Sequence, residues 1–440
     1  MSEIPSIKVL EAIKPINAGT GEDVLVYSGL EAAVQNYKPT NAQRSNEVWN
    51  SKQGSLEDVS KARQLALEYL LRTSEKVVES NEGNRDLWAD RFTQATTELY
   101  GEPEPTEVIK LLMNEVGLLT GLKDKEGISQ QHVNFLLDVY QPIIADFSVI
   151  GNIESAQAQV EQEKAAIQKY GEAIREKYQP IFDLVDEAGK TEFTFTDLQE
   201  LFTKALDWLK DNDDPEWSKW EVVLVDGIIL SVQASGRKIK IGTHRESASP
   251  KDTCGLLAHE LLVHALRGKN GYKTGDKELA TGLVGYLDAE EGLGVLAREA
   301  INNESPEKAY DDYIDIALAL GTVDGIQRTR KEMFEISYAR QQVRLELQGA
   351  DEAVISSLAP RVWGHIDRMY RGGRGDDLGT KQAIFTRDIV YYVGYKQMAE
   401  YITSQLANGR SATEVFNYLS QAKFDPNNPQ HVERVANPKT

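Results

Sequence analysis

The sequence His259-Glu260-Leu261-Leu262-Val263-His264 lies near the middle of the 440-residue chain, in a segment that is predicted to be one helix. Ser249 is a suitable N-cap residue, and Pro250 fits the first helical position. Gly268 follows at the other end of the segment, where glycine commonly ends a helix. Both histidines are therefore expected in the middle of a helix.

Two histidines with a carboxylate directly after the first are typical of helical zinc hydrolases, in which the histidines bind the metal and the glutamate handles the proton of a water. The usual spacing of the histidines is four residues, whereas here it is five. An ideal α-helix turns by about 100° per residue, so His259 and His264 would point about 140° apart. A π-type turn brings residues i and i+5 onto one face, and we therefore expect a bulge between Glu260 and His264.

The two histidines alone do not establish a metal site, because both could be buried polar residues on an apolar helix. Zinc in a catalytic site usually has three protein ligands and one open position. A second helix, predicted over Asp276 to Ala300, places the adjacent carboxylates of Glu290 and Glu291 among leucines. An unpaired buried carboxylate is costly, so a metal ion is one expected partner. A solvated pair of charges at the helix edge is the alternative.

These segments resemble the tyrosine carboxypeptidase family, whose animal members detyrosinate tubulin and whose bacterial relatives carry a QEGLA motif. The resemblance implies that His259, His264 and Glu291 bind one Zn²⁺ per chain and that Glu260 is the catalytic base. The family varies between Gln and Glu at the position before Glu291, which favours Glu291 as the ligand. This chain departs from the family pattern at Gly294, where the family often has alanine.

Residues further along the chain are candidates for binding the substrate. Arg371 and Arg374 belong to a glycine-rich basic turn that could bind a carboxylate in a bidentate manner, although a solvated loop is the alternative. Tyr391 matches a tyrosine of the family and could donate a hydrogen bond to the oxyanion of a tetrahedral intermediate. Tyr392 and His365 are alternative donors, and a packing role is open to each of the three.

The composition indicates a soluble globular protein, with 41% hydrophobic and 27% charged residues. No apolar run is long enough to cross a membrane, and Met1 to Pro15 lacks the pattern of a secretory signal. Cys254 is the only cysteine, which excludes an intramolecular disulfide and favours a cytoplasmic location.

The formal net charge of −20 disfavours nucleic acid and anionic membrane surfaces as partners, because the long-range field repels them. The tubulin tail is also strongly acidic, so tubulin is not predicted as a substrate. The expected partner is the C-terminus of a peptide or protein.

The predicted fold is α+β and predominantly helical, with a zincin-like catalytic core in which a small antiparallel sheet lies beside the HExxxH helix. Three β-branched runs, Trp220 to Val225, Ile228 to Ala234 and Lys238 to Ile241, are separated by tight-turn dipeptides and predict an antiparallel meander. One edge of this sheet could hold a substrate backbone by strand addition, or the sheet could only support the helix.

The expected organisation is a helical N-terminal region over 1–190, packed on the catalytic part, and a metallopeptidase domain over 191–425. The polar tail, 426–440, is expected to be disordered. The highly charged segment Glu154 to Tyr178 is predicted to be a helix that lies largely on the surface.

The favoured function is that of a zinc carboxypeptidase that removes a C-terminal residue, with tyrosine or another aromatic residue as the first candidate. Glu260 would act as the general base. The alternatives are a zinc endopeptidase, which needs no group to bind a terminal carboxylate, and a metal-stabilised regulatory scaffold. A scaffold would have no need of Glu260.

Overall fold

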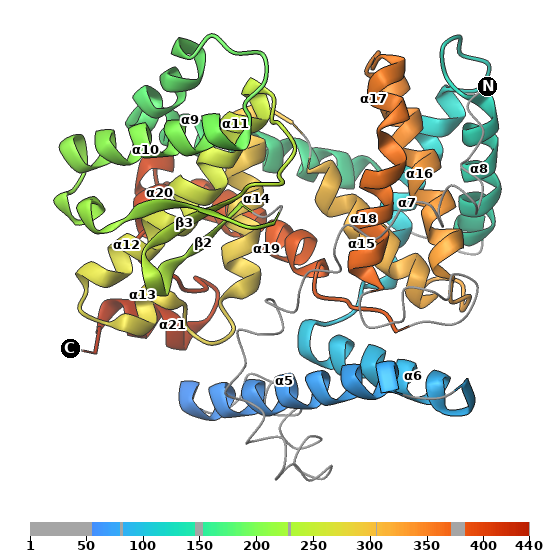
Figure 1. Ribbon diagram of the computed structural model, residues 1–440, viewed down its shortest axis with the longest axis horizontal. Helices are drawn as coiled ribbons and strands as arrows, with labels where there is room; N and C mark the ends of the chain where they lie inside the picture. The colour runs from blue at the N-terminus through green and yellow to red at the C-terminus, as the bar shows by residue number, and fades with distance from the viewer. Residues whose placement is uncertain are drawn as a thin grey trace. The chain divides into compact units, whose positions relative to one another are not determined.

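The computed structural model describes residues 55–79, 82–145, 153–227, 230–304, 306–370 and 383–439. These residues are predominantly helical and include one small sheet, which confirms the predicted α+β class (Figure 1). The chain divides into two compact units, and each unit combines two separate stretches of sequence. None of the helices in the described ranges combines the length and the apolar character that a membrane span requires.

Unit 1 comprises residues 1–151 and 308–389. Helix α16 packs against both α8 and α18, and Figure 1 shows α15 to α18 in orange beside the cyan α7 and α8. The helices assigned to this unit are α5 (Leu56–Glu79), α6 (Glu82–Tyr100), α7 (Pro105–Gly121), α8 (Gln130–Ala145), α15 (Glu307–Leu320), α16 (Arg330–Leu347), α17 (Glu352–Ser356) and α18 (Leu358–Met369).

A network of buried charges joins three helices of unit 1. Arg340 of α16 contacts Asp311 and Asp315 of α15, with nitrogen–oxygen distances of 3.0 and 2.6 Å. The ring of His365 on α18 lies between two carboxylates, with Nε2 3.0 Å from Asp315 and Nδ1 3.3 Å from Asp312. Burial alone would lower the pKa of this imidazole, but the two carboxylates raise it. The network therefore connects α15, α16 and α18 through paired charges.

Unit 2 comprises residues 152–307 and 390–440, and it contains the sheet and the HExxxH segment. Its first elements are α9 (Ile153–Glu187), α10 (Phe195–Asn212), η1 (Pro215–Lys219), β1 (Glu221–Val225), β2 (Leu230–Gln233), η2 (Ala234–Gly236) and β3 (Lys238–Gly242). They are followed by α11 (Pro250–Leu256), η3 (Leu257–Ala265), α12 (Leu266–Lys273), α13 (Lys277–Thr281), α14 (Leu287–Asn302), α19 (Ile389–Ala407), α20 (Ala412–Leu419) and α21 (Pro429–Ala436).

Helix α9 is a core helix, and the prediction that it lies largely on the surface is wrong. It packs against α14 and α20, and Ile174 and Tyr178 are fully buried. A Cβ atom at Gly171 would lie 2.8 Å from the Cβ atom of Ala300, so the two helices touch there. Small residues allow this close approach, and their burial leaves only a weak hydrophobic signal in the sequence.

The sheet is mixed rather than an antiparallel meander. Its strand order is β1-β3-β2, with β1 parallel to β3 and β2 antiparallel to β3. β3 is the central strand, and its Ile239 and Ile241 side chains are fully buried. Because β3 is central, the backbone groups along both of its edges form hydrogen bonds with neighbouring strands. The predicted strand positions are therefore close, whereas the predicted pairing is wrong.

The second predicted helix, Asp276 to Ala300, is divided into α13 and α14. Gly282 and Gly285 lie between the two helices and have φ angles of 109° and 85°. Positive φ is incompatible with a right-handed helix and is favoured at glycine. The interruption starts α14 at Leu287, shortly before the two glutamates.

The tail, which was expected to be disordered, contains helix α21. Asn428 caps this helix by accepting a hydrogen bond from the backbone N–H of Gln430 at 3.0 Å. His431 is fully buried, and Arg434 pairs with Asp276 at 2.6 Å. His431 and Arg434 on one face of α21 therefore attach the end of the chain to unit 2. Because these residues are polar, hydrophobic periodicity in the sequence does not reveal the contact.

Candidate metal centre

The HExxxH segment is a π-helix over Leu257–Ala265, and the predicted bulge between Glu260 and His264 is confirmed. The preceding turn is α11, where the Ser249 hydroxyl accepts a hydrogen bond from the backbone N–H of Asp252 at 3.1 Å. The wider turn brings residues i and i+5 together. The rings of His259 and His264 accordingly have centroids 4.7 Å apart and an interplanar angle of 79°.

His259, His264 and Glu291 form a cluster whose possible ligand atoms all lie within 4.8 Å of one another. The Nε2 atoms of the two histidines are 3.8 and 3.7 Å from Oε2 of Glu291. Tetrahedral coordination with metal–ligand bonds near 2.1 Å separates ligand atoms by about 3.4 Å. The three residues thus need only a small adjustment to bind one metal ion. The structure brings together the three residues that were predicted as ligands.

Close helix packing places Glu291 opposite the histidines. Helix α14 packs against η3, and α19 crosses α14 where Gly292 faces Gly394. A Cβ atom at Gly394 would lie 1.9 Å from the carbonyl oxygen of Asp288, so the two backbones are in direct contact. A residue with a side chain cannot occupy this crossing without separating the helices.

Gly294 makes space for the ring of His259. A Cβ atom at Gly294 would lie 2.6 Å from Cε1 and 2.7 Å from Nε2 of that ring. The resemblance to the family singled out this position because alanine is common there. In this chain an alanine would displace the imidazole from its observed position.

Gly294→Ala is therefore expected to weaken metal binding by about ten- to a hundredfold, the usual cost of disturbing a group that orients a ligand. The measurement is competition for zinc against a coloured chelator. Gly117→Ala is the matched control, because Gly117 is an exposed helical glycine whose added Cβ would meet no atom within 4 Å. Equal metal affinity in the wild type and both variants would contradict this role of Gly294.

Glu290 contacts His264 on the side of the ring that faces away from Glu291. The sequence did not predict this role for Glu290. Its Oε1 atom lies 2.8 Å from Nδ1 of His264, which leaves Nε2 of that ring to face Glu291. Arg267 and Lys423 both bind the carboxylate of Glu290. Although burial raises the pKa of Glu290, these two cations and His264 hold it well below its usual range.

The electrostatics of the cluster favour positive charge. Burial lowers the pKa of an imidazole, but the carboxylates of Glu290 and Glu291 outweigh burial and raise the pKa of His264 to about 10. His259 behaves differently, since burial and the neighbouring His264 lower its pKa to about 3. A neutral imidazole beside a position that attracts a cation is suitable for binding a metal.

Arg267 connects the cluster to the C-terminal part of the chain. Its Nε and Nη2 atoms donate hydrogen bonds to the carbonyls of Ala422 and Phe424, at 2.8 and 2.6 Å. Lys423 lies between these two residues, and its backbone N–H donates to the carbonyl of Leu279 at 2.9 Å. No sequence signal pairs Arg267 and Lys423 with Glu290, because the folded chain brings these three residues together.

Glu260 is buried next to the cluster. Its residue is 9% exposed, and its Oε2 atom is buried without a hydrogen-bond partner among the described residues. Burial raises the pKa of this carboxyl to about 7, and Glu291 contributes in the same direction. An unpaired carboxylate oxygen in this position fits a catalytic water beside a bound metal ion.

The remaining predicted site residues are less closely tied to the cluster. Tyr391 is half-buried on α19, one turn before the glycine crossing with α14, and the neighbouring Tyr392 is buried. His365 belongs to unit 1, where its ring is held between two carboxylates. Arg371 and Arg374 lie outside the described residues, so their role remains a prediction.

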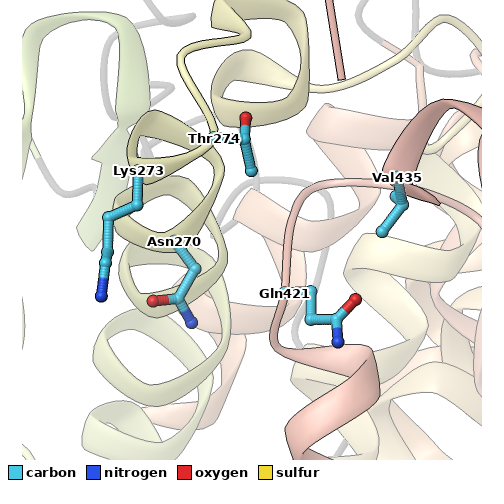
Figure 2. A pocket seen from close by; sticks show the side chains of 5 residues that line it. All are labelled: Asn270, Lys273, Thr274, Gln421 and Val435. Carbon is cyan, nitrogen blue, oxygen red and sulfur yellow. The ribbon is translucent and has the colours of Figure 1, made fainter. Parts of the chain in front are cut away.

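A surface pocket of about 260 Å³ lies elsewhere in unit 2. Figure 2 shows Asn270 and Lys273 on one helix, α12, with Gln421 and Val435 opposite them. Asn270 is already bonded to the carbonyl of Ser420 at 2.8 Å. The pocket is lined by none of the cluster residues, and we do not assign it to the candidate metal centre.

A π-helix with two histidines, a facing carboxylate and a buried glutamate together define a candidate metal centre of the kind that hydrolases use. Residues 154–309, which include these four side chains, match a family model described as microtubule-associated tyrosine carboxypeptidase. The resemblance to the tyrosine carboxypeptidase family is thereby confirmed for this part of the chain, and the family implies a peptidase of the carboxypeptidase type. No curated protein and no solved structure matches the chain.

Proposed function

We propose that this chain is a zinc-dependent peptidase that removes the C-terminal residue of a peptide or protein. The observation that carries this proposal is Glu260, whose buried Oε2 atom lacks a hydrogen-bond partner among the described residues and lies beside the metal-binding cluster. A metal-stabilised scaffold would gain nothing from this additional carboxylate, because burying it costs free energy. The family match favours a carboxypeptidase over an endopeptidase.

His259, His264 and Glu291 would hold the zinc ion, and two imidazoles with one carboxylate are a usual donor set for catalytic zinc. Bound there, zinc supplies Lewis acidity and lowers the pKa of a water to about 7. Glu290 keeps His264 in the orientation that presents Nε2 to the metal position, because its carboxylate binds the opposite ring nitrogen.

Glu260 carries the proton through the reaction. Its Oε2 atom accepts a proton from the attacking water, and the same carboxyl then donates this proton to the departing amine. Burial raises the pKa of this carboxyl, which favours uptake of the proton. Tyr391 remains our candidate donor to the oxyanion, and a hydrogen bond there would stabilise the charge that develops on the carbonyl oxygen.

The released residue is proposed to be tyrosine or another aromatic residue, following the description of the matched family. Tubulin itself is not proposed as the substrate. The net charge of −20 repels an acidic protein tail, and repulsion of this kind slows association.

The proposed function is tested with a panel of synthetic peptides that differ only in the C-terminal residue. Mass spectrometry should detect products shortened by that one residue, and 1,10-phenanthroline should abolish their formation until zinc is restored. Cleavage at internal bonds would instead indicate an endopeptidase. Stoichiometric zinc without cleavage of any peptide would indicate a scaffold, and both results would overturn the proposal.

A further inference from the structure

Arg245 lies in the loop after β3, three residues beyond Gly242 at the end of that strand. Its backbone N–H donates to the carbonyl of Gly242 at 3.3 Å, and β3 itself packs against the π-helix η3. The loop therefore begins beside the helix that carries His259 and His264. Arg245 is half-buried, and its Nε atom is buried without a hydrogen-bond partner in the described part of the chain.

The charged groups around Arg245 are Glu260, Asp252, Glu246 and Arg298. Asp252 already binds Arg298, with a nitrogen–oxygen distance of 2.8 Å, and Glu246 is exposed. Glu260 is the one buried carboxylate among these charged groups, but its Oε2 atom makes no hydrogen bond with any described residue. Within the described ranges, no carboxylate forms an ion pair with Arg245.

Other buried guanidinium groups in unit 2 are compensated. Arg267 binds Glu290 and two backbone carbonyls, and Arg434 binds Asp276 and Glu278. Arg245 differs because it is partly removed from water without an equivalent anion, and burial lowers its pKa accordingly. A desolvated cation of this kind is unfavourable unless an anion binds it. The loop thus carries a guanidinium without an ion pair among the described residues, close enough to Glu260 for their charges to interact.

We propose that Arg245 binds the free α-carboxylate of the substrate residue that is released. The inference rests on the proposed carboxypeptidase function and assigns the residue that recognises the chain end. The carboxylate of a departing residue lies about one residue length, or about 3.5 Å, beyond the carbonyl that water attacks. The proton of that water would pass to Glu260, whose carboxylate is influenced by the charges of Arg245 and Lys423. Lys423 is already bound to Glu290. A guanidinium binds a carboxylate through two parallel hydrogen bonds.

The test compares the binding of N-acetyl-tyrosine and N-acetyl-tyrosinamide to the zinc-loaded protein by titration calorimetry. The wild type should prefer the free acid by about ten- to a hundredfold, as expected for a charge-assisted bidentate contact. Arg245→Gln should remove this preference while leaving the affinity for the amide unchanged. Arg245→Lys should retain part of the preference for the free acid, because lysine keeps the positive charge but cannot form two parallel hydrogen bonds to a carboxylate.

Arg410→Gln is the matched control, since Arg410 is exposed in the same unit and should leave the preference intact. An unchanged affinity of the Arg245→Gln protein for the amide shows that its site is still folded. The assignment would be overturned if Arg245→Gln weakened the binding of both ligands equally, or if it kept the preference for the free acid. It would also be overturned if the wild type bound both ligands alike or bound neither. Loss of the preference in Arg371→Ala but not in Arg245→Gln would also overturn it.

The peptide panel separates this inference from the proposed function. Release of C-terminal residues without any dependence on Arg245 contradicts only the role of Arg245. Absence of release from every peptide contradicts the proposed function, whereas binding of the free acid through Arg245 would still be measurable.

Discussion

Glu260→Gln is expected to lower the rate of peptide hydrolysis by a factor of about 10² to 10⁴, the usual contribution of a general base. Glutamine has nearly the size of glutamate but cannot accept the proton of the attacking water. The fold should persist, because Oε2 of Glu260 forms no hydrogen bond with a described residue that the substitution would break. The measurements are kcat on the best peptide of the panel, zinc content by mass spectrometry, and thermal unfolding.

Glu299→Gln provides a matched control for this experiment. Glu299 lies in the same unit, its Oε2 atom is also buried without a partner among the described residues, and burial raises its pKa to about 8. It lies eight residues beyond Glu291 on α14, which is about 12 Å along the helix. Its substitution should leave hydrolysis unchanged. Full turnover in Glu260→Gln would show that another group takes the proton.

Zinc binding should fall by more than about a hundredfold when His259, His264 or Glu291 is replaced by alanine, because each change removes one of three ligands. The wild type should contain one zinc ion per chain. Affinity is measured by competition with a chelator, and stoichiometry by metal analysis of the purified protein.

Two further variants show whether the loss is specific. Glu290→Gln should weaken binding by only about ten- to a hundredfold, since Glu290 orients His264 without facing the metal position. His244→Ala should have no effect, because His244 is exposed and pairs with Asp226 at 3.0 Å. Retention of wild-type zinc affinity in all three ligand variants would exclude the site. A larger loss in Glu290→Gln than in Glu291→Ala would exchange the roles of the two glutamates.

The candidate site was largely predictable because its chemistry restricts local sequence. The spacing of His259 and His264 is incompatible with one face of an ideal α-helix, so a shared metal ion required the π-helix that the structure shows. The caps at Ser249 and Pro250 placed the start of this segment correctly. The choice of Glu291 over Glu290 came from the family resemblance, and the geometry of the cluster agrees with that choice.

Packing between distant segments was not predictable in the same way. Polar residues attach α21 to unit 2, and small residues allow α9 to approach α14, so neither contact produces the strong hydrophobic periodicity that sequence reasoning uses. The turn dipeptides marked the ends of the strands but not their partners. Strand order depends on which strand pairs along both of its edges, and here that strand is β3.

The sequence by itself indicated His259 and His264 as candidate ligands, Glu260 as the candidate base and the π-turn that carries them, because these features depend on residues close together in the chain. Only the tertiary structure decided what holds these groups in place. Glu290 binds Arg267, 23 residues away in the sequence, and Lys423, 133 residues away. Arg245 likewise became a candidate only when folding brought its charge within reach of Glu260 and left its guanidinium Nε without a described partner. A charged side chain needs a partner of opposite charge when it is buried, and which side chains are buried is decided only by the fold.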